Sequence, residues 1–336
     1  MRKIFKKKYT NFRKCLIEIK YDFELENTGF VPQGVCAIDD KIVVACYDGN
    51  GNNNSILLVF DQDNKKMLFL DSKIHCGGIC YHKKTDSFFI TGKGKGEKAF
   101  INRYCGKDIV SAKEKSIIVV DKILCVDEVG ELYSTAAKHS SVAFINCYEN
   151  NVILGNFINY KSDKKGTIKK YRCLNNGELS VYYSRLSNPY SDTQGICIFK
   201  FNGEEYYAIS RSFGRNRNSI LNIAKLNNNS FQNFSTIVMP CMAQQVSIID
   251  GKMAVVFESC ADKYRDTALS NSNGVYFLDL SKLLTCNDTF KDFCRGDKLF
   301  IDNKGIKMYW KLDFLHIICY NLEAWGWFGF DGNRRA

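Results

Sequence analysis

The sequence predicts an all-β fold assembled from a repeated unit of four short strands. Three observations support this prediction. A polar residue beside glycine or another small residue opens an alternating apolar run at five places along the chain, each opening is followed by further strand-like runs, and helical periodicity is scarce. Such units placed around an axis form a β-propeller, in which four-stranded blades add up without dividing the core.

The strand openings are the most regular part of the repeat. They read Pro32-Gln33-Gly34-Val35, His75-Cys76-Gly77-Gly78-Ile79, Ser140-Ser141-Val142, Thr193-Gln194-Gly195-Ile196 and Gln244-Gln245-Val246. Their spacings of about 43, 65, 53 and 50 residues suit one four-stranded blade each.

Three further apolar runs follow most openings. The second runs cover 41–46, 87–91, 151–155, 206–210 and 253–257, and the third runs cover 55–60, 99–101, 167–171, 219–223 and 274–278. Fourth runs include 67–70 and 179–183. Turn pairs such as Asn202-Gly203 and Asp250-Gly251 separate first from second runs, because they supply the positive φ that tight hairpins need.

The number of blades depends on the longest interval between openings. Residues 117–120, 123–126 and 131–134 are additional strand-like runs with room for a degenerate blade. We therefore favour six blades of four antiparallel strands, with five blades as the alternative. Residues 15–19 precede the first opening as 67–70 precede the second, so we expect an N-terminal outer strand to complete the last blade and close the ring.

Three segments are expected along the chain: a basic N-terminal tail (1–14), the β-propeller (15–284) and an aromatic-rich C-terminal capping segment (285–336). The formal charge is +11, and seven basic residues fall before the first acidic residue, Glu18. They are Arg2, Lys3, Lys6, Lys7, Lys8, Arg13 and Lys14. A solvated tail is the expected reading, and docking on an anionic membrane or on nucleic acid is the alternative.

The cysteines and the lack of targeting signals suggest a cytoplasmic protein. No apolar segment of a secretory signal follows the basic start, and no run reaches the roughly 18 apolar residues of a transmembrane helix. Fifteen is an odd number of cysteines, and many lie in strand-like runs, so we expect reduced thiols in the core. Cys76 and Cys80 form a CxxxC pair near His75 and His82, but no second pair completes a structural zinc site.

The openings at residues 31–35, 75–79 and 194–196 resemble those of the lactonase-like six-bladed propellers, a group that includes gluconolactonase-like and NHL-type proteins. The resemblance covers roughly residues 15–284. It implies a divalent cation such as calcium, held at the central channel by acidic and amide side chains. The matching positions here are neutral: Gln33, His75, Ser140 or Ser141, Gln194, and Gln244 or Gln245.

The same strand openings supply the first candidate site. The innermost strands of a propeller line its axis, so their starts converge at one mouth of the channel. A ring of Gln33, His75, Gln194, Gln244 and Gln245 could orient a small polar ligand by hydrogen bonds. Alternatively, these groups hydrogen-bond the loops between blades, because buried polar groups need partners.

The loops after the second strands supply the remaining candidates. Glu258 and Asp262 could act as acid and base or bind a metal, with Arg265 holding an anion, or they could form local ion pairs. Arg211 and Arg215 could bind phosphate or carboxylate.

Two functions remain open at this stage. The first is a binding or interaction protein with a polar or anionic ligand at the channel mouth. The second is a lactonase-like hydrolase or lyase that uses Glu258 or Asp262, with or without a divalent cation, and His75 or His139 as general base. Whether the protein is an enzyme is left open by the sequence.

Overall fold

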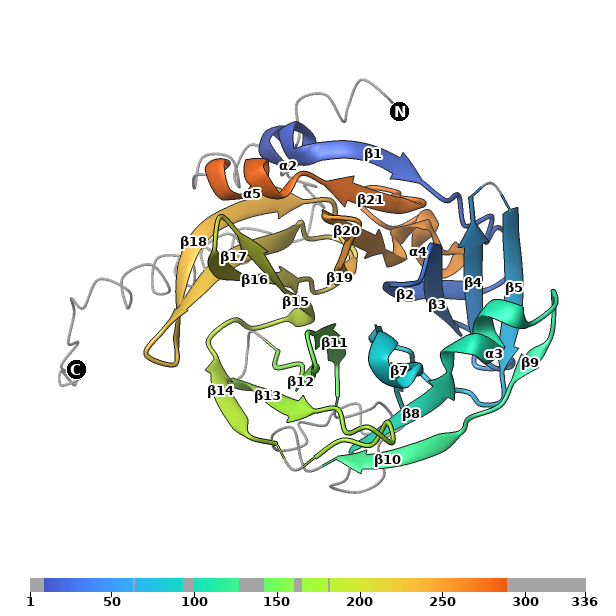
Figure 1. Cartoon of the computed structure of the whole chain (residues 1–336). Coiled ribbons are helices and arrows are strands. Elements are labelled where there is room, and N and C mark those ends of the chain that lie inside the picture. Colours follow the sequence, from blue (N-terminus) through green and yellow to red (C-terminus); the bar gives the residue numbers. More distant parts are fainter. Residues whose placement is uncertain are drawn as a thin grey trace, which may run out of the picture. The chain divides into compact units, whose positions relative to one another are not determined.

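Five β-sheets succeed one another around a common axis in the computed structural model (Figure 1). The structure describes residues 9–62, 64–92, 99–126, 142–159, 165–180 and 182–288. Within these residues the chain is a five-bladed β-propeller, and the first strand of each blade lies nearest the axis. The all-β prediction and the five-blade alternative are confirmed, whereas the preference for six blades is wrong.

Blades 1 and 2 account for the residues that we assigned to a sixth blade. Blade 1 contains β2 (Phe30–Ile38), β3 (Lys41–Asp48), β4 (Ile56–Asp61) and β5 (Asn64–Leu70), and blade 2 contains β6 (Ile79–His82), β7 (Ser87–Thr91), β8 (Ala99–Cys105) and β10 (Lys122–Val126). The short strand β9 (Ile117–Ile118) joins β5 in parallel, as a fifth strand of blade 1. Two of the three extra runs therefore extend existing blades, and 131–134 lies outside the described residues.

Blades 3 and 4 follow the repeat along the chain. Blade 3 contains β11 (Phe144–Tyr148), β12 (Asn151–Gly155), β13 (Gly166–Arg172) and β14 (Ser184–Asn188), and blade 4 contains β15 (Thr193–Phe201), β16 (Glu204–Arg211), β17 (Ser219–Asn227) and β18 (Ser230–Met239). The fourth strand of blade 3 was expected at 179–183 and instead begins at Ser184. Leu179 forms an isolated bridge with Cys173 in the turn that precedes it.

Blade 5 is shared by the two ends of the propeller, as predicted. It contains β19 (Ala243–Ile249), β20 (Lys252–Phe257), β21 (Val275–Leu278) and the N-terminal strand β1 (Leu16–Lys20). The β1 strand pairs antiparallel with β21, so residues from the start of the chain provide the outer strand of the last blade. This pairing closes the ring.

Short helices connect and flank the blades. They are α2 (Thr10–Cys15), α3 (Gly106–Ser111), α4 (Asp262–Arg265) and α5 (Leu280–Thr285), with 3₁₀ turns η1 (Lys83–Thr85) and η2 (Glu258–Cys260). Phe12 on α2 is fully buried, with its ring centroid 6.3 Å from that of Phe257 and 6.0 Å from that of Tyr276. Residues 9–14, which we expected in a solvated tail, therefore pack against blade 5. Residues 1–8 and 289–336 lie outside the described residues.

The core consists of five apolar clusters, each between two neighbouring blades. Alternate residues of one strand enter different clusters: Val43 and Ala45 of β3 face blade 2, and Val44 faces blade 5. Because both faces of each sheet are buried, inner strands appear in the sequence as unbroken apolar runs. No helix among the described residues is long and apolar enough to span a bilayer.

Glycines allow the innermost strands to approach one another closely. A Cβ atom added to Gly195 would lie 2.7 Å from Cα of Gln245, and one added to Gly78 would lie 2.7 Å from the backbone nitrogen of Ile145. Both neighbours are backbone atoms of the adjacent blade. The glycine of the repeated opening is therefore required for packing around the axis.

Candidate functional site

Irregular pairing at the strand openings turns several of the predicted polar side chains out of the regular ladder. The β2–β3 register shifts between Pro32 and Gly34, and the β15–β16 register shifts between Thr193 and Gly195. In blade 5 the shift lies between Ala243 and Val246. Bulges of this kind redirect a side chain, and here they include Gln33, Gln194, Gln244 and Gln245.

Gln245 fills the axis of the propeller. Its Oε1 accepts a hydrogen bond from the Ile79 backbone nitrogen at 2.8 Å, and its Nε2 donates to the Ile79 carbonyl at 2.6 Å and to the Ile145 carbonyl at 3.4 Å. Nε2 also lies 3.1 Å from Oγ of Ser247, which donates to the Val35 carbonyl at 2.6 Å. These bonds join the inner strands of four blades and favour a structural role for Gln245.

Two other glutamines surround the carboxylate of Glu258 at the end of the blades where the first strands begin, which we call the mouth. Gln33 and Gln244 are buried, and Nε2 of Gln33 donates a hydrogen bond to Oε1 of Glu258. Burial raises the pKa of the Glu258 carboxyl from 4.5 to about 7, although hydrogen bonds from both amides and the charge of Lys263 act in the opposite direction. Glu258 as a whole residue is partly exposed. At neutral pH this carboxyl can therefore either donate or accept a proton.

An aromatic pair lies next to this carboxyl. The hydroxyls of Tyr47 and Tyr264 are 3.1 Å apart, and the ring of His75 lies 4.5 Å from that of Tyr47, centroid to centroid. Burial raises the pKa of both tyrosines, and the neighbouring Glu258 charge acts in the same direction. The hydroxyls therefore remain protonated at neutral pH and can donate hydrogen bonds. Of the residues singled out in the sequence, the structure brings Gln33, Gln244 and Glu258 together, and His75 lies beside Tyr47.

Two basic side chains flank the tyrosines. Lys263 Nζ lies 5.9 Å from the ring centroid of Tyr47 and 5.6 Å from that of Tyr264, and the Arg215 guanidinium carbon lies 5.1 Å from that of Tyr264. Arg215 also donates to Oγ1 of Thr267 at 2.8 Å. We call Gln33, Tyr47, His75, Gln244, Glu258, Lys263, Tyr264 and Arg215 the mouth cluster.

Asp262 and Arg265 form a local network beside the mouth cluster. Arg265 pairs with Asp262 at 3.1 Å and with Glu26 at 2.9 Å, and it donates to the Cys260 carbonyl. Asp262 also accepts from the Gly29 backbone nitrogen at 3.4 Å. These contacts connect α4 to the segment before β2, as the ion-pair alternative anticipated.

The remaining predicted residues do not join the mouth cluster. Arg211 donates to the Ser191 carbonyl at 2.9 Å and to Oγ of Ser191 at 3.2 Å. Gln194 donates to the Ser212 carbonyl at 3.0 Å, within its own blade. Both contacts favour a structural role, in which these side chains bind nearby loop backbone. His139 lies outside the described residues.

The mouth cluster does not fit the calcium site implied by the lactonase-like resemblance. Calcium takes six to eight oxygen ligands, among them several carboxylates. Here Glu258 is the carboxylate at the centre, Gln33 presents its amide nitrogen to it, and Asp262 is engaged by Arg265. Within the described ranges, no three His, Cys, Asp or Glu side chains gather in a way that could hold a metal ion.

Tyr47, Lys263 and Tyr264 were absent from the predicted site residues. The sequence contained one usable signal, because Tyr47 stands near the end of the second strand of blade 1 just as Glu258 follows the second strand of blade 5. Equivalent strand ends lie at the same mouth in every blade. The sequence thus places Tyr47 on the same face as Glu258, although it was not named as a site residue.

A shallow depression lies at the opposite end of the blades. Its volume is about 500 Å³, and turn residues of blades 2 and 3 form its wall. They are Lys84, Glu149, Asn150, Asn151, Arg172, Cys173, Leu174 and Asn175. None of them belongs to the mouth cluster.

Comparisons with known proteins support no family assignment. No family model matches the sequence, and no curated protein matches it. Solved structures similar to this chain include an oxidoreductase from Thermus thermophilus that is described as a glucose dehydrogenase, with 10% identity over 78% of this chain and 98% of that chain and a TM-score of 0.47.

Two other similar structures carry different descriptions. An exo-β-1,3-galactanase from Phanerochaete chrysosporium is 12% identical over 84% of this chain and 69% of that chain, with a TM-score of 0.45. The WD40 propeller domain of Doa1 is 11% identical over 80% of this chain and 98% of that chain, with a TM-score of 0.37. The propeller assignment therefore rests on the sheets of this chain, and function must be argued from its own residues.

Proposed function

We propose that this protein binds a small polar ligand at the mouth of its channel, through the mouth cluster. The observation that supports this most is the Glu258 carboxyl, which accepts a hydrogen bond from a buried amide although Glu258 as a whole residue is partly exposed. Buried polar groups at such a position are suited to orient a ligand by directional hydrogen bonds.

The composition of the cluster favours a hydroxylated or anionic ligand. The hydroxyls of Tyr47 and Tyr264 and the carboxyl of Glu258 can donate or accept hydrogen bonds. Lys263 and Arg215 add positive charge at the rim, which attracts carboxylates or phosphates. Sugar acids and their lactones combine both features, so they are the first compounds to test.

The alternative function is a metal-independent, lactonase-like hydrolase or lyase. One observation favours it: a carboxyl with a pKa of about 7 can act as a general acid or base at neutral pH, and His75 lies against Tyr47 in the same cluster. We rank it second, because no activated nucleophile accompanies these groups among the described residues.

Calorimetric titration of the full chain separates the two functions. The probes are glucose, gluconate, gluconolactone and inorganic phosphate, and lactone hydrolysis is followed in parallel. We expect at least one probe to bind with one-to-one stoichiometry and to be recovered unchanged. Hydrolysis of the lactone by the wild type, lost in Glu258→Gln, would favour the enzyme instead, and no binding by any probe would refute the proposed ligand class.

Two variants test whether the mouth cluster carries the binding. Glu258→Gln should weaken the binding at least about tenfold, because a hydrogen bond to a charged group contributes about 1.5–3 kcal/mol. Glu149→Gln is the matched control, since Glu149 is exposed at the opposite end of blade 3 and pairs with Lys200. Equal affinity of the Glu258→Gln variant and the wild type would place the ligand elsewhere.

A further inference from the structure

Two thiols from neighbouring blades lie almost in bonding contact. Sγ of Cys147 on β11 is 2.8 Å from Sγ of Cys80 on β6, whereas a disulfide bond measures about 2.05 Å. The two residues are 67 positions apart in the chain. We propose that Cys80 and Cys147 form a reversible disulfide that joins blades 2 and 3.

The backbone holds this thiol pair in place. The innermost strands β6 and β11 pass each other so closely that a Cβ atom on Gly78 would lie 2.7 Å from the Ile145 backbone nitrogen. Cys80 and Cys147 each lie two residues beyond this contact, on the same side of their strands as Gly78 and Ile145. Bond formation therefore requires a small side-chain movement and no rearrangement of the sheets.

The two thiols differ in their access to an oxidant. Cys147 is partly exposed, whereas Cys80 is buried and burial raises the pKa of its thiol. Residues 149–151, just beyond Cys147, form part of the wall of the depression of about 500 Å³ at this end of the blades. Cys147 is consequently the thiol that meets a dissolved oxidant first, and Cys80 is the resolving thiol.

Thiol–disulfide exchange with a low-molecular-weight disulfide completes the chemistry. The Cys147 thiolate attacks one sulfur of the oxidant, forms a mixed disulfide and releases one small thiolate. Cys80 then gives up its proton and displaces the second small thiolate as the Cys80–Cys147 bond forms. The protein loses two hydrogen atoms, and the oxidant is reduced to two thiols.

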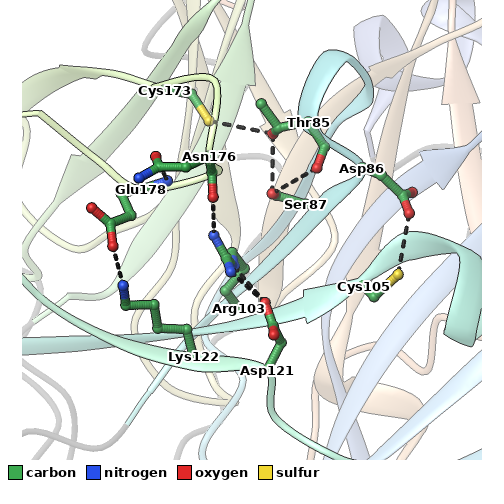
Figure 2. Close-up of polar contacts among 10 residues, drawn as sticks. All are labelled: Thr85, Asp86, Ser87, Arg103, Cys105, Asp121, Lys122, Cys173, Asn176 and Glu178. Carbon is green, nitrogen blue, oxygen red and sulfur yellow. Dashed lines mark hydrogen bonds and ion pairs between the residues drawn. The ribbon is translucent and has the colours of Figure 1, made fainter.

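The same interface is otherwise held by noncovalent contacts, which Figure 2 shows. Lys122 pairs with Glu178, and Arg103 donates to the Asn176 carbonyl at 2.6 Å, so blade 2 binds the turn that follows β13. Thr85 lies 3.5 Å from the sulfur of Cys173. A disulfide at Cys80 and Cys147 would add a covalent connection to these solvent-facing contacts, and oxidation would then stabilise the interface between blades 2 and 3.

Peptide mapping of the full chain tests the proposal. Reduced protein is incubated with oxidised glutathione, free thiols are blocked with N-ethylmaleimide, and the digest is analysed by mass spectrometry. We expect a peptide pair joined through Cys80 and Cys147 that dithiothreitol separates. A Cys80 that remains fully alkylated after oxidation, or that is joined to Cys36 or Cys173 instead, would overturn the proposal.

A matched variant and a wild-type measurement complete the test. Cys147→Ser should abolish the crosslink. Cys197→Ser should retain it, because Cys197 is the equivalent of Cys80 in blade 4 and lies outside the interface between blades 2 and 3. Oxidation of the wild type should raise its melting temperature by roughly 5 °C or more, reversibly. An unchanged melting temperature in the presence of the mapped crosslink would refute the stabilised interface.

Discussion

Replacement of Glu258 by glutamine should change the way in which stability depends on pH. The pKa of this carboxyl is about 7 in the folded protein, against an ordinary value of 4.5. Below about pH 4.5 the carboxyl is protonated in both the folded and the unfolded state. It then makes no pH-dependent contribution to the free energy of unfolding. Between the two values the unfolded chain releases the proton and the folded protein retains it, so wild-type stability falls as pH rises. Above about pH 7 the carboxyl is ionised in both states, and the folded protein carries the full free-energy cost of the buried charge.

The magnitude follows from the two pKa values. One pKa unit corresponds to about 1.4 kcal/mol, so the shift from 4.5 to about 7 sets an upper limit of about 3.5 kcal/mol for this carboxyl. Because Glu258 as a whole residue is partly exposed, we expect a smaller effect of about 1–2 kcal/mol. The glutamine side chain has nearly the same shape and never ionises. The Glu258→Gln variant should therefore gain this amount over the wild type between about pH 5 and pH 8.

Urea denaturation of both proteins at the two pH values measures this effect, since groups common to both proteins cancel in the difference. Asp279→Asn serves as a control without this pH dependence, because a carboxyl whose pKa lies below 3.8 in the folded protein is ionised in both states at pH 5 and at pH 8. The Asp279 carboxylate accepts hydrogen bonds from the Ser281 side chain and from the backbone nitrogens of Ser281 and Lys282, and these bonds lower its pKa. A stability difference between wild type and Glu258→Gln that is equal at both pH values would refute the raised pKa.

Three further substitutions and one control, Gly166→Ala, test the packing by urea denaturation. Gln245→Ala should lower the free energy of unfolding by about 3 kcal/mol or more, because it leaves the buried Ile79 amide and several carbonyls without their partner; a loss under about 1 kcal/mol would refute its role at the axis. Gly195→Ala should cost more than about 2 kcal/mol, since its Cβ meets backbone, whereas Gly166→Ala, with 3.2 Å to its nearest neighbour, should cost less. Phe12→Ala should cost about 3–5 kcal/mol if α2 belongs to the core, and a negligible loss would make residues 9–14 a tail.

The strands of the propeller could be predicted because two local signals agree. Both faces of each inner strand are buried, which leaves unbroken apolar runs such as 253–257, and Asn-Gly or Asp-Gly turns mark the hairpins between them. The outer strand of blade 5 was also predictable, because 15–19 repeats the position of 67–70. Pairing of β1 with β21 follows from the need to cover the open edges.

The blade number could not be predicted, because apolar character does not reveal which sheet a strand joins. Residues 117–118 pair in parallel with β5 of blade 1, and 122–126 pair with β8 of blade 2. Both runs read as strands in the sequence, yet each extends a blade that had already been counted. The pairing partner is a tertiary property that strand propensity does not encode.

The candidate site was predictable to the extent that it depends on equivalent positions in the repeat. Gln33 and Gln244 were singled out as strand openings and Glu258 as the end of a second strand, and the fold brings the three together. The sequence could not separate them from Gln245 or Gln194. Which glutamine faces the mouth and which faces a neighbouring strand is determined by the bulges, whose register depends on the partner strand.

The position of the site follows from the close packing of the ring. Glycines at the openings bring the inner strands within backbone contact, and the side chain of Gln245 occupies the space that remains at the axis. The inner strands are packed at that level, and the ligand site that we propose therefore lies at the strand ends. Glu258 accepts a hydrogen bond from Gln33 there, and burial raises the pKa of its carboxyl. The polar groups of the proposed site are thus those that the packed inner strands leave at their ends.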